Sequence, residues 1–365
     1  MALKDYLLSS ATPALLAYRS RSSAIRGALS RRLYSRAAAA SADSIVIGVV
    51  QMRLDLIDDG VAFALKCYDL VQQAVERGAQ LIVFPEYAWL PILGLLPSVR
   101  DWAAEGGTLQ AAVGELAPGG GLTIESVFRT MLPAVRRIFE TTGSELARRF
   151  GVYLVPGSAI TSDRAGRVFT AAYLFGPGGE LIGTQRKLHH ARIERSWNWL
   201  SVGSEVGVFD LPFGKLAMPV GIDYSYWESV RSAGMRNADI LLGSSHEENE
   251  DKLFKSRRGV AARIQENYAY GAEACCVTKL FGLSFGGPSD IVAPLGVWDN
   301  ESIFVAQTKT DDAEEVIAAR LDLAFLRKWR AAHPRDLNVK LYRKYLPRAY
   351  EMYRTRVTQD GKRKV

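Results

Sequence analysis

Short apolar runs alternate along the chain with stretches in which apolar residues recur at helical spacing. The run "SIVIGVVQM", residues 44–52, is rich in β-branched residues and bounded by polar ones, which predicts a buried strand. From Val61 to Val75 apolar residues follow every three or four positions, which is typical of a helix, and Gly78 is a plausible stop. "LIVFPE", residues 81–86, then predicts a second strand. The body of the chain therefore opens with a strand–helix–strand unit.

The same alternation continues to about residue 320. Further helix–strand patterns and strand pairs lie at residues 124–160, 168–187, 204–223, 229–245, 255–280 and 289–309, and residues 313–329 close the core. Helices and strands in alternation predict a layered α/β domain, and the short apolar strands indicate that helices cover both faces of its sheets. We expect one such domain at residues 44–325.

Residues 1–43 differ from this body because they are rich in Arg, Ser and Ala and contain only Asp5 and Asp43 as acids. If the segment is helical, its apolar residues share one face; they include Leu15, Tyr18, Ile25, Leu29 and Leu33. An amphipathic, acid-poor leader predicts an organelle transit peptide. If the protein is eukaryotic, we therefore expect it in the mitochondrion; otherwise we expect it in the cytoplasm. A helix resting on an anionic membrane surface and an unstructured basic leader are the alternatives.

The other end of the chain, residues 326–365, is basic and interleaved with tyrosines. We interpret it as a solvated tail or as a contact with a neighbouring subunit. The formal net charge of +7 comes largely from the two ends, and the body has no basic motif interleaved with aromatic residues. The sequence therefore argues against a nucleic-acid partner.

Composition narrows the chemistry further. Hydrophobic residues make up 48% of the 365 residues, enough for a large core. The cysteines are Cys67, Cys275 and Cys276, without a CxxC pair, which favours a reducing compartment and no disulfide framework. The four histidines form no HExxH motif, so we expect no metal site. No apolar run is long enough to predict a membrane span.

Polar residues that follow strands are the candidates for a functional site, because ligands bind beyond the carboxyl ends of strands in open α/β sheets. Glu86 ends "LIVFPE", Lys187 ends "LIGTQRK", and Glu194 comes seven residues after the lysine. A turn at Gly221 and Asp223 follows "KLAMPV". Each of these residues alone is a weak signal, but the set is more specific than any member.

Several motifs in the same order resemble the nitrilase or carbon–nitrogen hydrolase superfamily over roughly residues 45–320. They are "IVIGVVQM", "GAQLIVFPEY", "GELIGTQRKLHHARIER", "GVFDLPFGKLAMPVGID", "NADILLGSS", "AARIQEN" and "GGPSDIVAPLGVW". The resemblance implies an αββα sandwich that assembles into dimers or larger homo-oligomers and needs no cofactor. It also implies a pocket for a small amide or nitrile.

The resemblance assigns roles to the strand-end residues. It implies that Glu86 is the general base and acid, that Lys187 stabilises developing negative charge, and that Glu194 holds the geometry. Candidate binding residues are Tyr87 beside the glutamate and Asp223 in the turn. Two more are Trp197, which is a pocket or interface residue, and Cys275, which falls where the family often has asparagine.

The sequence departs from the family at the nucleophile. An ungapped alignment on "FGK" and "NADIL" places the family's cysteine at Gly221, which has no side chain to attack a substrate. We favour a pseudoenzyme that keeps the fold and a ligand pocket. The alternatives are changed chemistry, in which Glu86, Lys187 and Glu194 act with water, and a relocated thiol at Cys275 or Cys276.

Overall fold

The protein is described by a computed structural model, which covers residues 11–96, 99, 123–245, 259–298, 301–335 and 337–347. It divides into two compact units, Met1–Leu326 and Arg327–Val365. All the candidate site residues lie in the first unit. None of the helices in the part of the chain just given is long and apolar enough to cross a membrane.

The first layer of strands is built around β1 (Ser44–Arg53), which pairs in parallel with β2 (Leu81–Val83) and antiparallel with β15 (Glu315–Asp322). β2 continues in parallel to β3 (Tyr153–Val155). The other strands of this layer are β4 (Ser158–Ser162), β5 (Val168–Phe175), β6 (Leu181–Arg186) and β7 (Leu200–Ser201). β5 joins them, because it pairs with β3, β4, β6 and β7.

The second layer is built around β11 (Tyr270–Leu280), which runs parallel to β10 (Ile240–Ser245) and meets β1 where Met52 pairs with Cys276. Its other strands are β8 (Phe209–Leu211), β9 (Gly214–Ala217), β12 (Leu283–Phe285), β13 (Asp290–Val292) and β14 (Phe304–Gln307). The contact between β1 and β11 joins the two layers.

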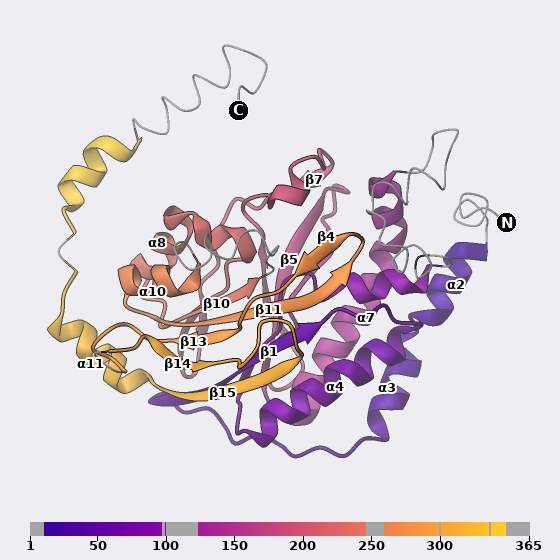
Figure 1. Ribbon diagram of the computed structural model, residues 1–365, viewed down its shortest axis with the longest axis horizontal. Coiled ribbons are helices and arrows are strands. Elements are labelled where there is room, and N and C mark those ends of the chain that lie inside the picture. Colours follow the sequence, from indigo (N-terminus) through magenta and orange to yellow (C-terminus); the bar gives the residue numbers. More distant parts are fainter. Residues whose placement is uncertain are drawn as a thin grey trace, which may run out of the picture. The chain divides into compact units, whose positions relative to one another are not determined.

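Helices cover the outer faces of these two layers (Figure 1). α4 (Gly60–Glu76) and α7 (Ile124–Phe150) lie on the first layer, and α8 (Trp227–Met235) and α10 (Val260–Asn267) lie on the second. The predicted αββα sandwich is therefore confirmed. The first unit also contains the 3-10 turns η1 (Leu90–Leu95), η2 (Arg192–Glu194) and η3 (Gly221–Ser225), and α11 (Leu323–Ala332) begins at its end.

Local sequence explains where α4 begins and how closely it packs against β1. The side chain of Asp59 accepts a hydrogen bond from the backbone N–H of Ala62 and so caps the start of α4. A Cβ at Gly48 would lie 2.9 Å from Cβ of Ala79 and 3.0 Å from Cβ of Ala74. Glycine at this position therefore allows β1 to lie directly against the end of α4.

The N-terminal segment adds two helices that sequence reasoning treated as a separate leader. α2 (Ala11–Arg19) and α3 (Ser22–Ser30) pack on α7, and α3 also packs on α4. Ile25 and Leu29 are fully buried, but Leu33, expected on the same face, is 87% exposed. The expectation of a single helical face was partly wrong, because α3 ends at Ser30 and Leu33 lies beyond it, outside any helix.

The second unit begins inside α11 and continues to residues 339–347, which are also helical. Tyr342 and Tyr345 on this stretch are 41% and 52% exposed. The tyrosines beyond residue 347 lie outside the described residues. The interpretation of residues 326–365 as a tail or a subunit contact stays a prediction.

Candidate functional site

Glu86 stands at the carboxyl end of β2, in a turn that packs tightly against its neighbours. The backbone N–H of Glu86 donates to the carbonyl oxygen of Ser245 at 3.3 Å, which ties the turn to the end of β10. The next residue, Tyr87, has φ of 58°, a left-handed conformation that costs a non-glycine residue free energy. Gly157 lies so close to the carbonyl of Pro85 that any side chain there would overlap with it. These contacts fix the direction of the Glu86 side chain.

Lys187 and Glu194 come from the segment after β6. The backbone N–H of Lys187 donates to the carbonyl of Thr170 at 2.8 Å, and its carbonyl accepts from Gly203 at 2.7 Å. Glu194 ends the turn η2, and its Oε2 accepts from the backbone N–H of Ala191 at 2.7 Å. The backbone thus holds both side chains before they meet each other.

The three charged side chains form one buried cluster. Nζ of Lys187 lies 2.6 Å from Oε1 of Glu86 and 2.7 Å from Oε2 of Glu194. Glu86 and Glu194 have no exposed surface, and Lys187 is 2% exposed. Charged hydrogen bonds this short are strong, and two carboxylates around one ammonium leave the cluster with a formal charge of −1.

Two opposing effects act on the pKa of Lys187. Burial favours the neutral amine, but the charges of Glu86 and Glu194 and their hydrogen bonds outweigh it and raise the pKa above its ordinary value. The ammonium therefore stays charged at neutral pH. A fixed positive charge in a water-poor site is suited to holding a ligand oxygen or nitrogen that carries partial negative charge.

Tyr87 links this cluster to its apolar surroundings. Its hydroxyl donates to Oε1 of Glu194 at 2.7 Å, and Nζ of Lys187 lies 5.4 Å from the centre of its ring. Burial raises the pKa of Tyr87 well above its usual value, and the charges of Glu194 and Glu86 add to the effect. The phenol is therefore a permanent hydrogen-bond donor to the cluster.

Gly221 begins the turn η3 directly beside the cluster. Its φ is +53°, and a Cβ built on it would overlap with Oε2 of Glu86. The carboxylate of Glu86 thus occupies the space that a side chain at residue 221 would need. The structure thus brings Gly221 next to Glu86, whose other carboxylate oxygen binds Lys187.

Asp223 ties two segments of the site together. Its carboxylate accepts hydrogen bonds from the backbone N–H groups of Val220, Leu188 and His189 at 2.9 to 3.1 Å. Nδ1 of His189 lies 3.0 Å from the same carboxylate, and its ring stacks on Tyr226 with 3.9 Å between the centres. Burial raises the pKa of Asp223, although its hydrogen bonds oppose the shift. Asp223 thereby holds the residues after Lys187 against those before Gly221.

The adjacent cysteines Cys275 and Cys276 are both fully buried on β11. Sγ of Cys275 lies 3.4 Å from the carbonyl oxygen of Pro288, and its backbone pairs with Ser245, whose carbonyl binds Glu86. Cys276 belongs to the apolar core. Cys67 lies on α4, where burial raises its pKa to about 12.

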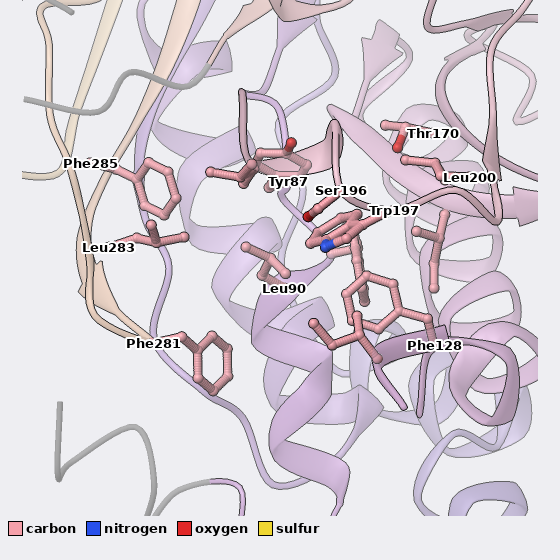
Figure 2. Close-up of a pocket in the computed structure, with 14 residues that line it drawn as sticks. Tyr87, Leu90, Phe128, Thr170, Ser196, Trp197, Leu200, Phe281, Leu283 and Phe285 are labelled. Atoms are coloured by element: carbon pink, nitrogen blue, oxygen red, sulfur yellow. The ribbon is translucent and has the colours of Figure 1, made fainter. Parts of the chain in front are cut away.

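An apolar cavity of about 200 Å³ adjoins the cluster at Tyr87 (Figure 2). Trp197, a predicted binding residue, lines it together with Phe128 from α7 and Phe281, Leu283 and Phe285 from the end of the second layer. Sequence reasoning did not find these last four residues. They carry no motif, and only the fold brings residue 128 close to residues 281–285.

Comparison with known proteins supplies a family for this arrangement. A family model described as carbon–nitrogen hydrolase matches residues 46–331. A nitrilase from Pyrococcus abyssi is 28% identical over 80% of this chain and 95% of its own. An omega-amidase from Xenopus laevis is 24% identical over 73% of this chain and 84% of its own. Among solved structures, a cysteine-to-alanine mutant of an amidase from Nesterenkonia sp. AN1, in complex with butyramide, has a TM-score of 0.59 and 20% identity. That similarity covers 83% of this chain and 98% of the other.

Proposed function

The chain belongs to the carbon–nitrogen hydrolase family, and from this we propose that it binds a small amide or nitrile but lacks cysteine-dependent hydrolysis. The ligand's carbonyl oxygen or nitrile nitrogen faces the ammonium of Lys187. The catalytic roles of Glu86, Lys187 and Glu194 become binding roles in such a pseudoenzyme.

The observation that carries the proposal is the environment of Gly221. This residue begins a turn at the edge of the charged cluster, where the motif order places the family's nucleophile. A glycine cannot form a covalent intermediate with a substrate. Losing the nucleophile of a covalent mechanism lowers the rate by roughly 10⁴-fold or more.

Two observations support amide binding in the absence of a nucleophile: a complex of a similar amidase, and the surroundings of Lys187. The Nesterenkonia amidase holds butyramide in a mutant in which alanine replaces a cysteine. In this chain the ammonium of Lys187 keeps its charge because two carboxylates surround it. A fixed cation in a buried site binds the polar end of an amide without any covalent step.

One observation favours a second candidate, hydrolysis by water. Glu86 and Glu194 remain assembled on Lys187, and burying such a cluster costs free energy that a purely structural role does not recover. In this alternative Glu86 takes a proton from water, which attacks the amide carbon while Lys187 stabilises the resulting oxyanion. The relocated thiol, at Cys275 or Cys276, is the remaining alternative.

Binding and ammonia release, measured on the same preparation, separate these functions. We expect calorimetry to detect butyramide binding that Lys187→Met removes, with no ammonia released from amides or nitriles. Ammonia release by the wild type that Glu86→Gln abolishes would contradict the pseudoenzyme and favour attack by water. Release that survives Glu86→Gln but is lost in Cys275→Ser or Cys276→Ser would favour the relocated thiol.

Restoring the missing side chain gives a direct prediction about Gly221. We expect Gly221→Cys to form a covalent adduct with acrylamide, because its thiol would lie beside Glu86 and Lys187. Glu86 must rotate to make room, and the left-handed backbone costs the new residue about 1 kcal/mol. Mass spectrometry measures the adduct. Gly221→Ala is the matched control because it has the same Cβ and backbone strain without a thiol. Equal labelling of the two variants would show that residue 221 does not face the ligand.

A further inference from the structure

We propose that the apolar cavity beside Tyr87 receives an aromatic ring on the ligand, so that the amides or nitriles bound here are aryl or arylalkyl compounds. This inference rests on the proposed function, because it places the rest of a ligand whose polar end lies at Lys187. It specifies a substrate class that amide binding alone does not require.

The cavity lies next to the charged cluster, because three of its wall residues also contact or adjoin the residues of the cluster. Tyr87 lines the cavity with its ring while its hydroxyl binds Glu194. Ile193, next to Glu194, is also a wall residue, and so is Thr170, whose carbonyl binds the backbone of Lys187. In the proposed binding mode, the substituent of a ligand whose amide lies at the cluster extends past Tyr87 into this cavity.

The chemistry of the walls selects the substituent. None of the 14 lining residues that the structure describes carries a charge. Figure 2 shows side chains of Phe281, Leu283 and Phe285 on one side of the space and those of Phe128 and Trp197 on the other. Aromatic rings bind other rings edge-on or offset, with centre separations of roughly 4.5 to 7 Å. A carboxylate in the same place would lose its hydration without gaining a cationic partner.

The aromatic wall is also rigid. The ring of Phe128 meets three tryptophan rings edge-to-face, at 5.0 Å from Trp89, 5.4 Å from Trp197 and 5.5 Å from Trp199. Trp197 and Trp199 stack on each other at 5.7 Å. Rings that hold one another in place lose little freedom when a ligand binds, which favours affinity. Ser196 is exposed and Trp197 half-buried, so this wall of the cavity lies near the protein surface.

Binding of three amides to the wild type tests the inference. Phenylacetamide should bind at least about tenfold more tightly than acetamide, because its ring buries apolar surface. Succinamate, which carries a carboxylate, should bind no more tightly than acetamide. Acetamide binding without a gain for phenylacetamide would overturn the cavity assignment and leave the amide-binding proposal standing. Binding of none of the three would overturn both.

A cavity-filling variant locates the ring. Leu283→Trp should remove the gain for phenylacetamide and weaken acetamide binding much less, because Leu283 lines the cavity and contributes no side chain to the charged cluster. Ser284→Trp is the matched control, since the next residue of β12 points to the opposite side of the strand and does not line the cavity. A tenfold gain that persists in Leu283→Trp would place the ring elsewhere.

A measurement on the wild type keeps the test independent of whether the variant folds. In saturation-transfer NMR with phenylacetamide, the ring protons should receive more saturation than the methylene protons beside the amide. The reverse order would mean that the ring stays in solvent, which would overturn the inference.

Discussion

Lys187 is an almost completely buried lysine that two buried glutamates hold at 2.6 and 2.7 Å. The charged form survives because the carboxylates compensate for lost hydration. Both carboxylates bind the same ammonium, so the three residues act as a unit. At the scale of single residues, the stability of the site and the proposed binding of an amide therefore depend on the same side chain.

Removing this ammonium should destabilise the fold strongly. We expect Lys187→Met to lower the free energy of unfolding by about 3 to 5 kcal/mol, because it leaves two buried carboxylates without a cation. Lys215→Met is the matched control, since Lys215 pairs with Asp210 at 3.4 Å on the surface and its loss should cost less than about 1 kcal/mol. Urea denaturation measures both variants. Equal effects would mean that solvent reaches the Lys187 cluster.

The residues of the cluster could be anticipated from the sequence, but the contacts of Tyr87 could not. Glu86 and Lys187 each follow a strand, and strand ends gather at one edge of a sheet. The hydrogen bond between Tyr87 and Glu194 joins residues 107 positions apart, and it requires a positive φ at a tyrosine. No local pattern predicts such a conformation, because it is imposed by the packing of the turn.

At the scale of elements, α2 and α3 form an additional layer outside α4 and α7. Ser22 and Thr141 join their hydroxyl groups at 2.8 Å, and a guanidinium nitrogen of Arg137 donates to Ser20. The guanidinium of Arg19 donates to the carbonyl of Leu95 at the end of η1, the turn that contributes Leu90 to the cavity wall. These contacts tie the N-terminal segment to the element beside the site.

Replacing two apolar residues of this segment by alanine should change the stability of the protein by different amounts. Ile25→Ala should lower the free energy of unfolding by about 2 to 4 kcal/mol, because Ile25 is fully buried against Ile138 and Gly60. Leu33→Ala should change it by less than about 0.5 kcal/mol, because Leu33 is largely exposed. Thermal and urea unfolding measure both. An Ile25→Ala variant as stable as the wild type would support a leader that the folded body does not need.

The strands and helices of the body were more predictable than the N-terminal helices. β1 is a continuous apolar run, and α4 has an unbroken helical spacing of apolar residues and a side-chain cap at its start. The local sequence pattern and the final structure therefore agree. The N-terminal apolar residues fit one long helix equally well as two short ones. Only the packing of Ile25 on α7 distinguishes these arrangements, and that contact is absent from any local window of sequence.

At the scale of the whole molecule, buried groups that hold their protons make the fold sensitive to alkaline pH. Burial raises the pKa of Cys67 from 9.0 to about 12, and burial also raises those of Tyr34 and Tyr270 from 10.0 to about 12. The unfolded chain loses these protons at lower pH than the folded protein does. Between the two pKa values the folded state binds more protons, so its stability falls as pH rises.

Cys67 isolates one part of this effect, because its thiol is fully buried on α4. Between pH 9 and 12 the wild type should lose about 1 kcal/mol more for each pH unit than Cys67→Ala, which has no proton to release. Urea denaturation at several pH values under reducing conditions measures the two slopes. The cavity left by the alanine shifts the whole curve by a constant amount and does not change its slope. Parallel curves would mean that the thiolate of Cys67 is as well solvated in the folded protein as in the unfolded chain. That outcome would require α4 to open locally below pH 12, and α4 would then not be a fixed support for the sheet that positions Glu86.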